Sequence, residues 1–446
     1  MKIVIAGAGD MGTHLAKMLS GNGHDITIAD VDPKALVEAG NLVDVVTVEG
    51  DTTQFSVLRK AGVRKCDLFI AVHSVENNNI LSAVMAKQLG AKKSIARIDS
   101  NEYLEPNSKE VFIDMGIDYL FYPEQIAARE VINLLGHTST SEYVDFAAGK
   151  LSMVAFRLEL TSPLLGKNVI DNEGYDEDLE YRTVAIVRGS HTIIPSADER
   201  YEEEDMVYVI CRHNATQRVV ELSGRREVEI RNMMILGGSR IGVRIANELQ
   251  NDINVKLVDY DADKAYRLAE ILDKTLIINE DGRDTEAMIE EDIAGMDAFV
   301  AVTGRSETNI LAAMLAKRMG VKKVIAEVEN INYISLAESI GVDTIINKKL
   351  VTASNIFRFT MSTDVQAIKC LTGSQAEVME FIVKPNSPAT KTRIRDLGLP
   401  SDAIIGGVVR GDRVFIAVDD TQINAYDRIV VFTMPESVVR VAEFFN

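Results

Sequence analysis

An internal repeat constrains this chain more than any other feature, because a segment that recurs must fold in the same way twice. Residues 2–12 read KIVIAGAGDMG and residues 232–242 read NMMILGGSRIG, so the pattern returns 230 positions later. Asn79 and Asn309 keep the same spacing, and each is followed by Ile-Leu. The chain therefore carries two copies of one structural unit.

The spacing between the copies shortens once. Gly116 and Gly341 are 225 positions apart, so copy one holds about five extra residues, which we place around 105–108. The segments that follow each copy also match, since Ser-Pro-Leu over 162–164 parallels Ser-Pro-Ala over 387–389. The order is therefore large unit, small unit, large unit, small unit. We predict domains over 1–140, 141–226, 227–360 and 361–446.

Hydrophobic patterning predicts the fold of each unit. In the large unit, short β-branched runs such as 3–6 and 26–29 are separated by helical stretches such as 11–20. Strand then helix, repeated, predicts a doubly wound parallel sheet with helices on both faces, which is a Rossmann-like α/β domain. The small units show alternating strands such as 207–210 and few helices. Each Rossmann-like domain is therefore expected to precede a small α+β domain.

The composition excludes several classes of protein. The net charge is −19 and Lys and Arg are not clustered, whereas nucleic-acid binding needs a basic patch. An acidic chain is also repelled by anionic lipid heads. Its longest apolar runs, such as 68–72, fall far short of the roughly 20 residues of a membrane span. We expect no nucleic-acid partner and no direct lipid insertion.

The cysteines favour a reducing compartment. Cys66, Cys211 and Cys370 are widely scattered, no two have the spacing of metal ligands, and their odd number argues against a disulfide framework. The simplest location is therefore the cytoplasm. If the protein sits at a membrane, a protein partner must hold it there.

A glycine-rich loop follows the first expected strand at once and opens a helix. Its glycines allow a tight turn and close approach of the backbone to a pyrophosphate, and the helix N-terminus adds N–H groups. Asp30 ends the second expected strand, where an acid accepts hydrogen bonds from ribose hydroxyls and repels a 2′-phosphate. The pattern predicts a site for NAD(H), ATP or ADP rather than NADP, formed by Gly7, Ala8, Gly9, Asp10, Met11, Gly12 and Asp30.

Further candidate residues follow other strand ends, where ligands of open α/β sheets bind. Asp51 and Thr52 lie after the third strand, and His73 and Ser74 lie after the fourth. Arg97 ends the fifth strand, and its guanidinium suits a phosphate. A salt bridge at the end of the sheet is the alternative for this arginine.

The second copy keeps the loop in altered form. Ser239 replaces the middle glycine, while Asp259 keeps the acid position. Serine is small, so we expect phosphate to approach with reduced affinity, and an empty structural copy is the alternative. Glu327 stands at the position of Arg97 and is expected to repel phosphate, which ranks this site second. Its candidate residues are Gly237, Gly238, Ser239, Arg240, Ile241, Gly242 and Asp259.

Catalytic chemistry is not indicated by the sequence. Of six histidines only His73 stands where a nicotinamide ring would lie, and no acid–base cluster follows in the small domain. There is no Ser/His/Asp order, zinc-ligand spacing or Walker lysine. The acidic run 202–205 indicates a solvated turn, with a divalent-cation site as a weaker alternative. An NAD-dependent oxidoreductase and a scaffold with vestigial sites are the alternatives to a nucleotide sensor.

Taken together, these residues resemble a known family. The GAGDMG loop, Asp30, the Gly-Asp-Thr-Thr run at 50–53, Asn79 and Arg97 resemble the nucleotide-binding half of RCK (KTN) domains. The small units, with Ser-Pro-Leu-Leu-Gly-Lys at 162–167, resemble the C-terminal half. Two such pairs in one chain of this length are similar to the peripheral cytoplasmic subunits of Trk-type potassium uptake systems.

The resemblance implies a regulator without catalysis. Members of this family assemble into a ring under a membrane potassium channel or transporter, and they bind NAD(H) or adenine nucleotides whose identity changes the shape of the ring. The implied partners are a Trk-type membrane subunit and further copies of this chain, with four chains in the ring. The implied location is the cytoplasmic face of the cell membrane.

The resemblance also implies roles for individual residues. Gly7 to Gly12 hold phosphates, Asp30 holds the ribose, and Asp51 and Thr52 lie near adenine. His73 stands where a small polar residue is expected. In copy two, the departures from the family pattern are Ser239, Arg283 and Glu327.

Two helices are expected after the last strand of each large unit, at 123–135 and 348–359. Their apolar faces suit either assembly surfaces or ordinary packing onto the parent domain.

Overall fold

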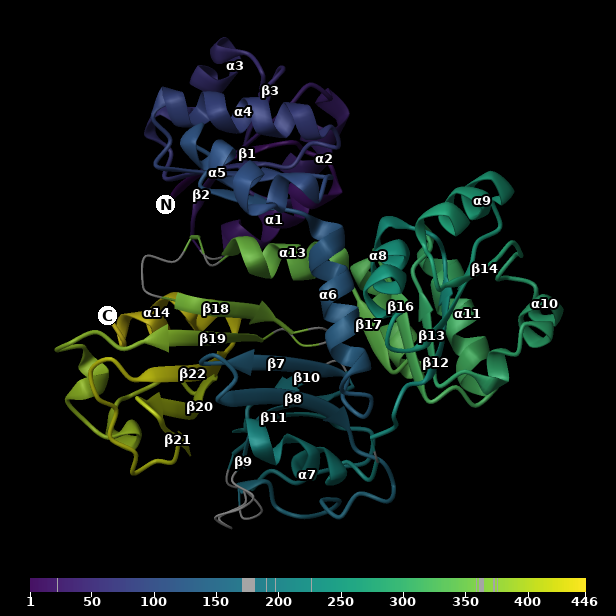
Figure 1. Ribbon diagram of the computed structural model, residues 1–446. Coiled ribbons are helices and arrows are strands. Elements are labelled where there is room, and N and C mark those ends of the chain that lie inside the picture. The colour runs from purple at the N-terminus through teal and green to yellow at the C-terminus, as the bar shows by residue number, and fades with distance from the viewer. Residues whose placement is uncertain are drawn as a thin grey trace. The chain divides into compact units, whose positions relative to one another are not determined.

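The structure is a computed structural model (Figure 1) that describes residues 1–21, 23–170, 181–189, 191–196, 198–225, 227–357, 359–360, 365–371, 374 and 376–446. The chain divides into two compact units. One unit comprises Met1–Ile126 together with Val351–Ser362, and the other comprises Ala127–Leu350 together with Thr363–Asn446. Each Rossmann-like copy lies in a different unit, so each site is described within its own unit.

Copy one is a six-stranded parallel sheet in the order β3-β2-β1-β4-β5-β6, which is the Rossmann order. Its central strands are apolar because helices cover both faces, and all of β4 is buried. The strands are β1 (Lys2–Ala6), β2 (Asp25–Asp30), β3 (Val46–Glu49), β4 (Leu68–Ala71), β5 (Lys93–Arg97) and β6 (Tyr119–Phe121). The helices are α1 (Asp10–Gly21), α2 (Pro33–Leu42), α3 (Phe55–Lys60), α4 (Glu76–Leu89), α5 (Pro106–Asp114) and α6 (Pro123–Leu135).

Copy two repeats this topology in the order β14-β13-β12-β15-β16-β17, again with parallel pairing. The strands are β12 (Asn232–Leu236), β13 (Asn254–Val258), β14 (Leu276–Ile278), β15 (Ala298–Ala301), β16 (Lys323–Glu327) and β17 (Thr344–Ile346). The helices are α8 (Arg240–Leu249), α9 (Ala262–Ile271), α10 (Thr285–Glu290), α11 (Ser306–Arg318), α12 (Ile334–Ser339) and α13 (Lys348–Phe357). The repeat predicted from the sequence is confirmed at the level of strand order.

The expected insertion is located where α5 begins. In copy one a short turn at Glu102–Leu104 precedes the nine-residue helix α5, whereas in copy two the turn Ile331–Tyr333 runs directly into the six-residue helix α12. Pro106 is suited to the first turn of a helix, where its missing N–H leaves no hydrogen bond unmade. The extra residues therefore lengthen this helix and its approach.

The small domains are antiparallel sheets of matching order. The first, β10-β9-β11-β8-β7, consists of β7 (Glu142–Phe146), β8 (Leu151–Arg157), β9 (Tyr181–Arg188), β10 (His191–Ile193) and β11 (Met206–Arg212), followed by α7 (Thr216–Glu221). The second, β18-β19-β22-β20-β21, consists of β18 (Val365–Cys370), β19 (Glu377–Ile382), β20 (Ala403–Arg410), β21 (Arg413–Ile416) and β22 (Arg428–Thr433), followed by α14 (Val438–Glu443). Residues of both sheets belong to one hydrophobic cluster, in which Tyr208 and Phe432 are in contact. The α+β prediction is confirmed.

The helices that follow the Rossmann sheets do not pack only onto the preceding domain. Residues of α6 such as Val131 and Leu134 share a hydrophobic cluster with the first small domain and with copy-two residues such as Ile245. Residues 351–357 of α13 belong to the unit of copy one, in which the ring of Phe359, two residues past the helix, lies 4.9 Å from the ring of Tyr119. Packing onto the parent domain is therefore an incomplete description of either helix.

The acidic run 202–205 is not a fully solvated turn. Asp205 is completely buried, and its carboxylate oxygens accept hydrogen bonds of 2.8 and 2.9 Å from the Arg188 guanidinium. The second small domain repeats the pair with Asp427 and Arg410 at 2.9 and 2.7 Å. The sequence interpretation was wrong for Asp205, because its partner lies on a neighbouring strand. No cluster suited to a metal ion is found among the described residues.

No helix in the described part of the chain has both the length and the apolar content needed to cross a membrane.

Candidate functional site

The glycine loop of copy one forms a tight turn between β1 and α1. Gly7 has a φ of +111°, a left-handed conformation that favours glycine. A Cβ at Gly12 would lie 1.9 Å from the carbonyl oxygen of Gly7, so this position also requires glycine. A Cβ at Gly9 would meet nothing within 4 Å. Two glycines thus build the turn, whereas the third leaves open space beside it.

Asp30 is oriented by the glycine loop itself. Its carboxylate accepts hydrogen bonds from the backbone N–H of Ala8 at 2.7 Å and of Asp32 at 3.0 Å. The acid at the end of β2 is therefore held directly beside the phosphate turn, on the neighbouring parallel strand. This places the two expected ligand-binding features of copy one next to each other.

His73 lies beside Asp30, in the loop after β4. Its Nε2 is 2.7 Å from the hydroxyl oxygen of Thr52, and its Nδ1 is 3.9 Å from the Asp30 carboxylate. Burial lowers the pKa of His73 below its ordinary value, although the charges of Asp30 and Asp51 oppose this shift. A neutral imidazole is thereby favoured near pH 7. Asp51, Thr52 and His73 thus converge as expected.

Asn79 fixes the loop that carries His73. Its side-chain oxygen accepts a hydrogen bond from the His73 N–H at 2.6 Å, and its amide nitrogen donates to the carbonyl oxygens of His73 and Arg97. Asn309 makes the same contacts in copy two, to Thr303 and Glu327. The sequence analysis did not predict that these asparagines position the loops. Their common place in the two copies was the feature that could have indicated it.

Arg97 forms ion pairs at the end of β5. Its Nη2 lies 3.2 Å from Asp99 and 3.7 Å from Glu124. Its Nε is buried and has no hydrogen-bond partner among the described residues. The salt bridge that was the alternative for this arginine is therefore present in the structure.

The second glycine loop has a backbone like that of the first, but one of its N–H groups already donates a hydrogen bond within the protein. Gly237 has a φ of +106°, and a Cβ at Gly242 would lie 2.2 Å from the Gly237 carbonyl oxygen. The hydroxyl of Ser239 accepts a hydrogen bond from the Gly242 N–H at 3.3 Å and caps α8. Serine thus fits the turn and at the same time competes with a phosphate for this N–H.

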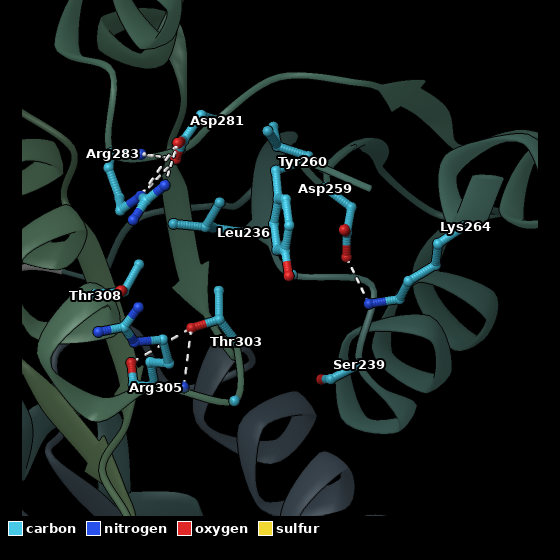
Figure 2. Close-up of a pocket in the computed structure, with 14 residues that line it drawn as sticks. Leu236, Ser239, Asp259, Tyr260, Lys264, Asp281, Arg283, Thr303, Arg305 and Thr308 are labelled. Carbon is cyan, nitrogen blue, oxygen red and sulfur yellow. Dashed lines mark hydrogen bonds and ion pairs between the residues drawn. The ribbon is translucent and has the colours of Figure 1, made fainter. Parts of the chain in front are cut away.

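A cavity of about 360 Å³ opens beside this loop. Figure 2 shows Asp259 and Lys264 on one side of it and Arg283 and Arg305 on the other. Lys264 Nζ is 2.6 Å from the Asp259 carboxylate, which also accepts a hydrogen bond from the Gly238 N–H at 2.8 Å. Burial opposes ionisation of Asp259, but the hydrogen bonds from Lys264 and the backbone hold its pKa below the ordinary value.

Glu327 is not one of the residues that line the cavity of the second site. It is 4% exposed, its carboxylate lies 3.3 Å from the Lys348 ammonium, and it does not line the cavity. The repulsion of phosphate by Glu327 stays a prediction, and Lys348 is the cation placed to offset it. The side chains that do line the cavity include the basic residues Lys264, Arg283 and Arg305.

The strand order and the two glycine turns define the class: a protein with two Rossmann domains of the dinucleotide-binding type, each followed by a small antiparallel domain. Residues 3–123 and 233–348 match the TrkA-N domain, and residues 378–446 match the TrkA-C domain. The chain belongs to the TrkA family.

Full-length relatives support this assignment. The Trk system potassium uptake protein TrkA of Halomonas elongata is 31% identical over 99% of this chain and 98% of its own length. That of Vibrio alginolyticus is 32% identical, over 98% and 97%. A TrkA homolog of Archaeoglobus fulgidus is 33% identical over the whole of both chains.

Solved structures share the fold. The crystal structure of the GsuK RCK domain has a TM-score of 0.61 at 15% identity, covering 99% of this chain and 94% of that one. The GsuK channel bound to NAD has a TM-score of 0.61 at 16% identity, covering 99% and 78%. At this identity the likeness concerns the fold, and it confirms the tandem Rossmann architecture expected from the sequence.

Proposed function

We propose that this protein is the nucleotide-binding regulatory subunit of a Trk-type potassium uptake system. The observation that carries the proposal is the glycine turn of copy one, whose Ala8 N–H donates a 2.7 Å hydrogen bond to the Asp30 carboxylate. The names of the full-length relatives, Trk system potassium uptake protein TrkA, supply the context. NAD(H), ATP and ADP all contain the ribose and pyrophosphate that such a crevice suits.

Different residues of copy one bind different parts of the nucleotide in this proposal. Backbone N–H groups of the loop Gly7 to Gly12 and the N-terminus of α1 receive the pyrophosphate. Asp30 accepts hydrogen bonds from the ribose hydroxyls, and Asp51 and Thr52 lie on the adenine side. His73, whose Nε2 lies 2.7 Å from the Thr52 hydroxyl oxygen, and Ser74 lie near the ligand beside them. Arg97, at the end of β5, is the residue that we assign to a phosphate of the ligand.

The role we propose for bound nucleotide is to bias conformation rather than to react. Both ring nitrogens of His73 already face protein groups, Thr52 on one side and Asp30 on the other, which disfavours a role as general base. A regulator requires only that its ligand binds two conformations with different affinity. We propose that four chains form a ring on the cytoplasmic face of the membrane, held there by a Trk-type membrane subunit.

Nucleotide titration of the purified full-length chain tests this function. We expect NADH, NAD, ATP or ADP to bind without turnover, as measured by isothermal titration calorimetry. In Gly9→Asp the carboxylate enters the space beside the turn and repels phosphate, so first-site affinity should fall at least about tenfold. Because a Cβ at Gly9 meets nothing within 4 Å, thermal unfolding of the unliganded variant should stay unchanged.

A second arm tests the regulatory role and the enzymatic alternative. Cells that depend on this system should lose nucleotide-sensitive potassium uptake when they carry Gly9→Asp. Unchanged first-site affinity in Gly9→Asp would overturn the site assignment. Steady oxidation of NADH that disappears in His73→Ala would replace the regulatory function with an oxidoreductase.

A further inference from the structure

The two candidate nucleotide sites differ in charge, although the backbones of their glycine turns match. Three basic side chains line the cavity of copy two, and each replaces an uncharged residue of copy one. Lys264 stands at the position of Ala35, Arg283 at that of Thr53, and Arg305 at that of Val75. Lys34, one residue before Ala35, forms no ion pair with Asp30 in the described part of the chain. The two copies therefore present different electrostatic fields to a nucleotide.

The pairing of these cations leaves an excess of positive charge in copy two. Lys264 is paired with Asp259, and Arg283 with Asp281 at 2.6 Å. Arg305 has no ion pair with any described residue. Among the described residues of copy one, no lysine or arginine forms an ion pair with Asp30 or Asp51. Within a chain of net charge −19, the second cavity is thus a local basic site.

Lys264 changes the electrostatic effect of Asp259, the acid that is expected to bind the ribose. The Asp259 carboxylate accepts hydrogen bonds from the N–H groups of Gly238 and Asp261 at 2.8 and 3.1 Å, and from the Lys264 ammonium. An acid at this position normally excludes a phosphorylated ribose through its charge. With Lys264 beside it, that repulsion is offset and a cation is available to a phosphate.

Arg305 acts at the opposite end of the cavity, as Figure 2 shows. It is the residue immediately before α11, so its guanidinium and the N-terminus of that 13-residue helix contribute positive charge at the same place. Asn309 fixes this loop through the Thr303 N–H at 2.9 Å. A phosphate that extends past the glycine turn would meet this end of the cavity.

We propose that the second crevice selects a nucleotide carrying a phosphate group beyond the pyrophosphate, and that Lys264 and Arg305 determine this preference. The proposal rests on the proposed function in that both crevices bind nucleotides, and it assigns them different ligands. Arg305 would bind a terminal phosphate, as in ATP. Lys264 would bind a ribose 2′-phosphate, as in NADPH.

Calorimetric titration of the full-length Gly9→Asp chain isolates the second site. ATP is compared with ADP, and NADPH with NADH. We expect the ligand with the additional phosphate to bind at least about tenfold more tightly in one or both pairs, the scale of one charge-assisted hydrogen bond. Arg305→Val, which copies Val75, should abolish a preference for ATP, and Lys264→Ala, which copies Ala35, should abolish one for NADPH.

The reciprocal exchange provides a matched control. Ala35→Lys in the otherwise native chain should weaken discrimination against NADPH at the first site, and unliganded thermal unfolding checks that each variant is folded. Equal binding of all four nucleotides at the second site would overturn the proposal, as would a preference that survives both substitutions. Failure of NADH, ATP and ADP to bind the first site of the native chain would contradict the proposed function instead.

Discussion

The glycine at position 12 is required by the carbonyl oxygen of Gly7, because a Cβ added at Gly12 would lie 1.9 Å from that atom. The start of helix α1 thereby lies so close to the end of β1 that only glycine fits at position 12. Gly242 and Gly237 have the same relationship in copy two, at 2.2 Å. The loop is thus specified by packing as well as by its ligand.

Gly12→Ala and Gly9→Ala should therefore have different effects. The first forces the backbone apart, and we expect a loss of about 1–3 kcal/mol, the scale of overpacking in a core. The second places its methyl group in open space, so stability should change by less than about 0.5 kcal/mol. Urea denaturation followed by circular dichroism measures both. Equal stability of the two variants would contradict this reading of the turn.

Arg188→Ala should strongly destabilise the first small domain. It leaves the carboxylate of Asp205, which is completely buried, without its guanidinium partner, at a cost of about 3–5 kcal/mol. Arg410→Ala should do the same at Asp427. Arg231→Ala is the control, because its pair with Glu229 is largely exposed on both sides and should contribute little. Denaturant midpoints that agree for all three variants would refute the prediction.

Glu377 should make stability depend on pH. It is 4% exposed, and burial together with the charge of Glu436 raises its pKa from 4.5 to about 7. The folded state therefore holds a proton that the unfolded state has released between these values, so this contribution to stability falls as pH rises from 4.5 to about 7. Glu377→Gln should be more stable than the native chain at pH 8, by about 1–3 kcal/mol, and similar to it near pH 4.5.

Thermal unfolding across this pH range provides the measurement. A difference between Glu377→Gln and the native chain that stays constant with pH would mean that Glu377 does not titrate in this window.

Lys323 should make stability depend on pH in the alkaline range, with stability rising rather than falling as pH increases. It is fully buried, its ammonium donates to the Thr140 carbonyl oxygen and to Thr344, and burial lowers its pKa from 10.5 to about 8. The unfolded state then binds more protons between about pH 8 and 10.5, so stability from this group rises with pH there. Lys323→Met should flatten that rise. Lys93→Met, the exposed counterpart in copy one, should leave it intact when unfolding is followed at pH 8 to 10.5.

Local patterns were sufficient to predict the glycine turns and the acids beside them. Gly7 and Gly12 are needed for steric reasons that act within a few residues, and Asp30 follows from the end of β2. The convergence of Asp51, Thr52 and His73 was also expected, because the carboxyl ends of parallel strands meet at one edge of a sheet. By contrast, the burial of Asp205 depends on Arg188, 17 positions away on another strand, and was predicted wrongly.

The sequence alone determined the repeat, the order of strands and helices, and the identity of the phosphate turns, since these depend on periodicity and on short-range sterics. Only the tertiary structure decided that Lys264 forms an ion pair with Asp259. It also decided that Arg305 lines the cavity, whereas Glu327 forms an ion pair with Lys348. The packing of α6 into a core shared with copy two was decided in the same way. These outcomes depend on which side chains of separate elements come within a few ångströms of each other. Charge pairing and burial are set by that proximity, which no local pattern records.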